Sequence, residues 1–113
     1  MTETCDLIIY RGADFGISFT VKDETGTILD LTGCTVTSQL RKSAMDPNHI
    51  DFICTHNNSG GLVLMNMPWS RTAGINFTHG VFDVIITDED GIREPALSGN
   101  VEIRMNVTKP AGG

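Results

Sequence analysis

The sequence predicts an all-β domain, an antiparallel sandwich or barrel of about seven to eight short strands with one short helical turn. Apolar and polar residues alternate strictly along residues 15–22, which is typical of a strand with one buried face. Turn-forming residues recur about every 8 to 12 positions, as in sandwiches and barrels. Only Pro68–Gly74 is suited to a helix, and it is too short to be stable by itself.

The N-terminal half contains the first expected strands. The run CDLIIY suits a first strand, and Gly26 suits the positive φ of a turn. Pro47 prevents a regular ladder in the loop over residues 43–49. The expected strands are Cys5–Tyr10, Phe15–Lys22, Thr27–Leu29 and Cys34–Arg41.

The C-terminal half reads as two short strands, the helical turn and a closing unit. The turn is expected to bridge the two sheets, with Trp69 as a plug at one end of the core. In the closing unit, Asp88–Gly91 is a tight turn because Asp-Gly is a frequent hairpin pair. The strands are Asp51–His56, Leu62–Met67, His79–Thr87 and Val101–Lys109, and a short strand followed by a loop is expected over Ile92–Asn100. The expected inward residues of the closing unit are Phe82, Val84, Ile86, Val101, Ile103, Met105 and Val107.

Length and charge limit the function classes. The 113 residues predict one domain over residues 1–109 and a loose tail over 110–113. A net charge of −6 argues against binding a nucleic acid backbone, which needs a positive face. No segment has the ~18 to 20 apolar residues of a membrane span. The N-terminus is polar and acidic, unlike a secretion signal, so we expect synthesis in a cytoplasm.

The residues that could carry chemistry do not form a known constellation. Cys5, Cys34 and Cys54 lack metal or redox spacing, and we expect them to be small buried side chains. The three histidines show no metal-ligand spacing. We therefore expect no enzyme, no metal and no cofactor. The one cluster worth checking comprises Asp46, His49 and His56.

Several turn and strand-edge motifs resemble small virion proteins of tailed bacteriophages. The order and spacing of these motifs, rather than any one of them, carry the likeness. Residues 43–76 depart from the pattern. The motifs are Arg11–Phe15, Val21–Gly26, Asp30–Val36 (DLTGCTV), Gln39–Lys42, Gly80–Gly91 and Leu97–Val101.

The resemblance implies an Ig-like β-sandwich that acts as an adaptor in the tail baseplate or fibre attachment region. Its expected partners are other phage structural proteins (baseplate, hub or fibre) in a symmetric multi-copy assembly, with no nucleic acid and no membrane. Its location would be the virion. Two alternatives remain open: a capsid decoration or head–tail joining protein, and a carbohydrate-binding host-recognition module. The latter would need Trp69 and Phe52 exposed and adjacent.

The expected contact residues lie in three loop regions. The acidic turn favours a basic partner patch and would bind less strongly at high salt. The residues are Asp46, Asn48 and His49; Trp69, Ser70 and Arg71; and Asp88, Glu89 and Asp90.

Overall fold

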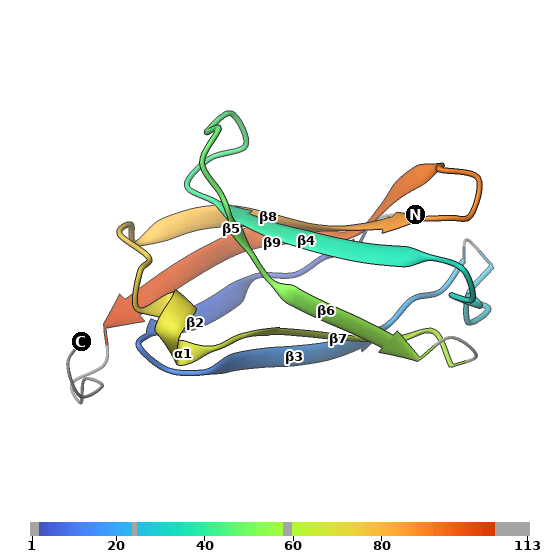
Figure 1. The fold of residues 1–113 in the computed structure, drawn as a ribbon, viewed down its shortest axis with the longest axis horizontal. Coiled ribbons are helices and arrows are strands. Elements are labelled where there is room, and N and C mark those ends of the chain that lie inside the picture. Colours follow the sequence, from blue (N-terminus) through green and yellow to red (C-terminus); the bar gives the residue numbers. More distant parts are fainter. Residues whose placement is uncertain (1–2, 24, 58–59, 106–113) are drawn as a thin grey trace.

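Two β-sheets face one another across an apolar core in the computed structural model, which describes residues 3–23, 25–57 and 60–105 (Figure 1). This arrangement is the all-β, Ig-like sandwich expected from the sequence. Nine strands are described, and two of them have only two residues, which leaves seven longer strands. The expected tail over 110–113 lies outside the described residues. Among those described, no helix is long and apolar enough to cross a bilayer.

The larger sheet has the order β1-β9-β8-β4-β5, and β2 also pairs with β9. Strands β4, β8 and β9 pair antiparallel, as expected. Strands β1 and β2 both run parallel to β9, so the expectation of a fully antiparallel sheet is wrong. The first expected strand, Cys5–Tyr10, begins only at Leu7 as β2, and a separate two-residue strand, β1, precedes it. The strands are β1 (Glu3–Thr4), β2 (Leu7–Arg11), β4 (Thr35–Arg41), β5 (Ile50–Asp51), β8 (His79–Thr87) and β9 (Arg93–Met105).

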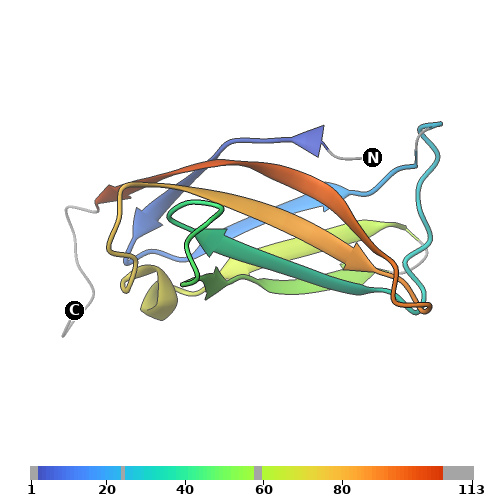
Figure 2. The same cartoon turned by 90° about the horizontal axis from the view of Figure 1, so that it is seen from above.

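The smaller sheet is antiparallel, with the order β3-β7-β6. Its strands are β3 (Phe15–Thr20), β6 (Ile53–Asn57) and β7 (Leu62–Met67). Seen from above in Figure 2, this sheet lies beneath the larger one. Helix α1 (Trp69–Thr72) follows β7, and Pro68 is its extended N-cap rather than its first helical residue.

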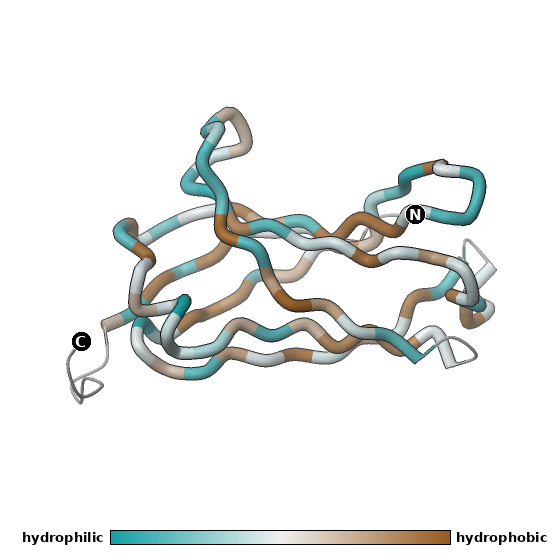
Figure 3. Tube along the Cα trace, in the orientation of Figure 1, coloured by the Kyte–Doolittle hydropathy of each residue, from teal (hydrophilic) through white to brown (hydrophobic). Residues whose placement is uncertain are grey.

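Strand periodicity builds the core. In β4 and β8 every second residue is buried, which produces the alternation of hydropathy along the strands in Figure 3. Phe52 is buried, and its ring centroid lies 5.9 Å from that of Phe15 and 6.4 Å from that of Phe82. Buried side chains from both sheets form one cluster, which includes Leu7, Ile9, Val36, Leu40, Val63, Met65, Met67, Val84, Val101 and Ile103.

Three segments differ from the expected strand pattern. Residues 27–29 form only an isolated bridge, Lys22 to Ile28. The strand expected over 51–56 divides at Phe52, because β5 pairs with β4 in one sheet and β6 with β7 in the other. The short strand and loop expected over residues 92–100 are instead part of the continuous β9 from Arg93 onward, in which a register shift leaves Ala96 as an extra residue beside Pro95.

Two residues that were expected to lie in the core, Trp69 and Met105, are exposed instead. Trp69 is 45% exposed, and buried Thr72 and Ile75 close that end of the core instead. Met105 is 59% exposed because it lies opposite Arg11 at the end of the sheet, where its sulfur accepts a 3.1 Å hydrogen bond from Arg11 Nη1. Val107 lies outside the described residues. The three cysteines are unpaired, with Cys5 exposed and Cys34 and Cys54 only partly buried.

Candidate docking surface

A groove of about 610 Å³ crosses the outer face of the larger sheet. Its floor is β4, β8 and β9, and Ala44 of the loop over residues 43–49 forms part of its rim. Polar side chains predominate in number in its lining, which also contains the apolar residues Ala44, Val81, Phe82 and Ile85. The lining includes Thr37, Gln39, Arg41, Asp83, Ile85, Arg93, Ser98 and Asn100.

Strand alternation sets which side chains reach this groove. In β4, Val36, Ser38 and Leu40 face the core, so Thr37 and Gln39 between them face outward. Buried Ser38 is satisfied because its Oγ donates a 2.6 Å hydrogen bond to the carbonyl oxygen of Asp83. This bond joins β4 to β8 directly under the groove, so the groove floor is held by side-chain as well as ladder contacts.

Arg41 fixes the loop at the groove rim. Its Nη1 donates a hydrogen bond to the carbonyl oxygen of Asp46, and its Nη2 donates one to Gln39 Oε1 at 2.8 Å. Within the loop, the Asn48 N–H donates to Asp46 Oδ1 at 2.9 Å, a local turn bond typical of aspartate. The predicted contact residues Asp46 and Asn48 therefore lie in a loop of defined shape beside the groove.

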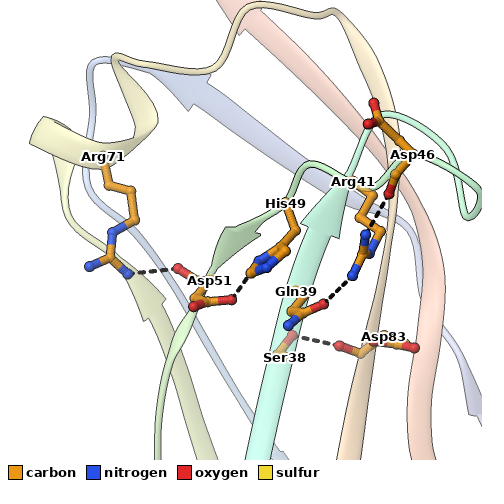
Figure 4. A network of polar contacts seen from close by, with 8 residues as sticks. All are labelled: Ser38, Gln39, Arg41, Asp46, His49, Asp51, Arg71 and Asp83. Atoms are coloured by element: carbon orange, nitrogen blue, oxygen red, sulfur yellow. Dashed lines mark hydrogen bonds and ion pairs between the residues drawn. The ribbon is translucent and has the colours of Figure 1, made fainter.

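Asp51 joins this loop to helix α1 (Figure 4). Its carboxylate accepts a 2.9 Å contact from His49 Nδ1, and its carbonyl oxygen accepts a 2.7 Å hydrogen bond from Arg71 Nη1. The N–H of Trp69 donates to Asp14 Oδ1 at 2.7 Å, which secures the start of the helix. Asp51 thus connects two of the three predicted contact regions, 46–49 and 69–71. Ser70, within the second region, is exposed.

The third predicted region lies elsewhere. The turn that carries Asp88, Glu89 and Asp90 is at the opposite end of the sandwich from α1 (Figure 1). Asp88 Oδ1 accepts hydrogen bonds from the N–H groups of Asp90 and Ile92, both at 2.9 Å. Asp88 therefore shapes the hairpin, while Glu89 and Asp90 are exposed. The three regions do not form one surface.

The cluster worth checking, Asp46, His49 and His56, is not assembled. Asp46 and His49 follow the end of β4, whereas His56 Nε2 bonds at 3.1 Å to the carbonyl oxygen of Cys34, just before β4 begins. In the part of the chain that the structure describes, no group of three metal-ligating side chains comes together. Phe52 is buried, so it cannot form the exposed aromatic pair with Trp69 that a sugar platform would need.

Neither partly buried thiol is set up as a nucleophile. Burial raises the pKa of Cys54 to about 11. Burial also raises the pKa of Cys34, and the nearby carboxylates of Asp88, Glu89 and Asp30 raise it further. A raised thiol pKa reduces the thiolate, which is the reactive form.

Sequence reasoning missed the groove itself. Many of its residues occupy outward positions of β4 and β8, and the alternation along these two strands is the signal that could have identified them; Ser98 and Asn100 lie in the segment where a short strand and a loop were expected. The pairing of β4 with β8 and of β8 with β9, which brings these positions together, cannot be read from periodicity.

Neither a protein-family profile nor a curated protein matches the sequence. Among solved structures, the GspB Siglec domain has a TM-score of 0.50 and 18% identity, over 93% of this chain and 56% of that one. A mutant of the SrpA adhesin from Streptococcus sanguinis (0.48; 16%; 88% and 55%) and the internalin-like protein lmo2027 from Listeria monocytogenes (0.43; 12%; 93% and 30%) have lower scores. The chain spans little more than half of the first structure. At this identity the likeness shows the fold alone.

Proposed function

We propose that this chain is a non-enzymatic structural module of a tailed-bacteriophage virion, an adaptor in the tail baseplate or fibre attachment region. The groove over β4, β8 and β9 would receive a segment of a neighbouring structural protein. The observation that carries the docking role is the groove with its fixed rim. The virion setting comes from the sequence resemblance.

The chemistry of the groove suits a polar protein segment. Hydroxyl, amide and guanidinium groups of Thr37, Gln39 and Arg93 supply donors, and Asp83 supplies a carboxylate acceptor. Arg41 already bonds to the loop, so the rim is ordered before a partner arrives. A pre-formed site lowers the entropy cost of docking. Copies arranged by symmetry would then multiply modest contacts into lasting attachment.

A carbohydrate-binding module is the second candidate, because the same hydroxyl, amide and guanidinium groups bind sugar hydroxyls. The groove lining contains one aromatic residue, Phe82, and its side chain is buried in the core. A glycan would therefore bind without the ring stacking that strengthens many sugar sites. Binding on a glycan array that Thr37→Arg abolishes would favour this candidate over a protein partner.

Purified particles test the virion role. Mass spectrometry of particles from the phage or prophage that encodes the chain should detect it, and electron microscopy should place it at the tail. Density on the capsid or at the head–tail junction would instead support a decoration or joining protein. Absence from the particle would overturn the virion role.

A groove-filling variant tests the docking surface. Thr37→Arg places a long side chain in the groove, whereas Thr55→Arg adds the same side chain to the exposed face of the other sheet. We expect Thr37→Arg to lose capture of dissociated particle proteins by the immobilised chain, and Thr55→Arg to retain it. Equal capture by both variants would remove the groove from the proposal while leaving the virion role to the particle experiment.

A further inference from the structure

The outer face of the smaller sheet carries no charged side chain among the described residues. This is notable for a chain with a net charge of −6. The exposed side chains of this face are small or polar, except for those of Ile53 and Leu64, which are 42% and 46% exposed. Its exposed residues are Gly16, Ser18, Thr20, Ile53, Thr55, Asn57, Leu64 and Asn66.

Strand β3 forms an unpaired edge of this face. Its single ladder partner in the described structure is β7. Just beyond β3, the Val21 N–H donates a 2.8 Å hydrogen bond to the carbonyl oxygen of Gly61, which directly precedes β7. The backbone N–H of Val21 therefore points to the β7 side of β3. Backbone direction alternates along an antiparallel strand. The N–H and C=O groups of Gly16, Ser18 and Thr20 therefore point away from β7, toward the free edge.

The other edges are shorter or closed. Strand β5 has two residues, and the edge made by β1 and β2 is interrupted at Cys5 and Asp6. Strand β6 has five residues, against six in β3, and its His56 side chain bonds to the carbonyl oxygen of Cys34, just before β4. Natural edge strands are usually protected by lysine, proline, a bulge or a cover. The six residues of β3, FGISFT, include no charge and no proline, and their register with β7 is regular.

We propose that β3 pairs with β3 of a second copy of this chain, antiparallel, about a two-fold axis at Ser18. In that register Ser18 lies opposite its own copy and Gly16 lies opposite Thr20. Each hydrogen-bonded pair exchanges two backbone bonds, so the contact forms about six. The two smaller sheets become one continuous sheet of six strands, β6-β7-β3 followed by its symmetry mate.

A second copy fits this edge better than an unrelated strand. The edge is self-complementary under a two-fold axis, as an isologous contact requires. Two chains of net charge −6 repel one another, and this face is where they meet without placing like charges in contact. The contact uses the sheet opposite the groove. The β3 contact would link copies of the chain in the assembly proposed above. The argument for this contact depends on β3 alone and not on the groove.

The test combines oligomeric state with a matched pair of variants. Sedimentation of the full chain from about 1 to 500 μM should show a reversible dimer, since modest interfaces dissociate in the micromolar range. Ser18→Lys places two ammonium groups together at the axis. Thr55→Lys makes the same change in the same cross-strand row, but on β6. We expect Ser18→Lys to raise the dimer Kd at least about tenfold and Thr55→Lys to leave it unchanged.

Hydrogen exchange on the unmodified chain tests the register without a variant. The amides of Gly16, Ser18 and Thr20 should become protected as concentration rises. Those of Phe15, Ile17 and Phe19 should be protected at every concentration through β7. A chain that is monomeric at 500 μM, or a dimer in which these three amides stay unprotected, would overturn the proposal. Groove variants should not affect either measurement, so failure here is distinguishable from failure of the docking function.

Discussion

The hydroxyl oxygen of Thr72 accepts a 3.0 Å hydrogen bond from the N–H of Gly12, which fastens helix α1 to the turn between β2 and β3. The same hydroxyl donates to the carbonyl oxygen of Ala13 at 2.9 Å. Thr72 is fully buried. One polar side chain in a four-residue helix therefore holds together the end of the sandwich where β2 of the larger sheet ends and β3 of the smaller sheet begins.

Replacing Thr72 with valine should destabilise the fold. The change keeps the shape but removes the hydroxyl, which leaves the partly buried Gly12 N–H and Ala13 carbonyl without their partner. We expect a loss of about 1–3 kcal/mol in the free energy of unfolding. Urea unfolding monitored by circular dichroism measures it. Ser70→Ala, on the exposed side of the same helix, should change the value by less than about 0.5 kcal/mol.

Adding a methyl group at Gly99 should disturb the N-terminal strands. A Cβ at this position would lie 1.8 Å from the carbonyl oxygen of Cys5, so the backbone between β1 and β2 must move. We expect Gly99→Ala to cost about 1–3 kcal/mol, as overpacking does. At Gly16 the nearest atom to a new Cβ is 3.9 Å away, and Gly16→Ala is the control. Equal stability of the two variants at low protein concentration would contradict the close approach of Cys5 to β9.

The cysteines should react in a definite order. Cys5 is exposed, whereas burial raises the pKa of Cys54 to about 11. At pH 8 a thiol with that pKa is about one thousandth thiolate, so Cys54 should alkylate at least about tenfold more slowly than Cys5. Peptide mapping after iodoacetamide treatment measures the order. In urea the three cysteines should react at similar rates; a difference that persists there would show that burial is not the cause.

Two turn aspartates should titrate below the ordinary range. The pKa of Asp23 is lowered by hydrogen bonds from the Thr25 hydroxyl and from neighbouring N–H groups, among which that of Thr27 contributes most. The pKa of Asp30 is lowered by hydrogen bonds from the hydroxyl and the N–H of Thr32. A lowered carboxylate pKa stabilises the folded state above the unfolded pKa, near 3.8, and this contribution is lost as pH falls through the folded value. NMR titration of the two carboxyl carbons should give midpoints below 3.8. Midpoints at or above 3.8 would contradict the turn geometry.

Asparagine variants link these midpoints to stability. Asp23→Asn and Asp30→Asn keep an acceptor oxygen but cannot ionise. The slope of the free energy of unfolding against pH, between about pH 4 and pH 2, should be smaller in each variant than in the unmodified chain.

Local sequence was sufficient where a single strand or turn is concerned. The alternation along β4 and β8 predicted which side chains are buried, and that along β3 predicted which are partly buried against the core. Glycine at positions 26 and 91 predicted turns in which φ is +86° and +83°. These features depend on neighbours one to four residues away, which the chain order states directly. Together with the regular spacing of turns, they were enough to identify an all-β sandwich.

Partner choice between strands was decided by the tertiary structure. Periodicity reports that a residue faces inward, but not which sheet its strand joins, so the change of sheet at Phe52 and the parallel pairing of β2 with β9 were not foreseen. Pro95 reads locally as a strand breaker, yet the bulge at Ala96 admits it into β9. The groove arises from the pairing of β4 with β8 and of β8 with β9, which brings together residues up to about 60 positions apart in the chain. Local residues determined that sheets form and which faces are buried, while long-range hydrogen bonding determined which outward positions lie side by side.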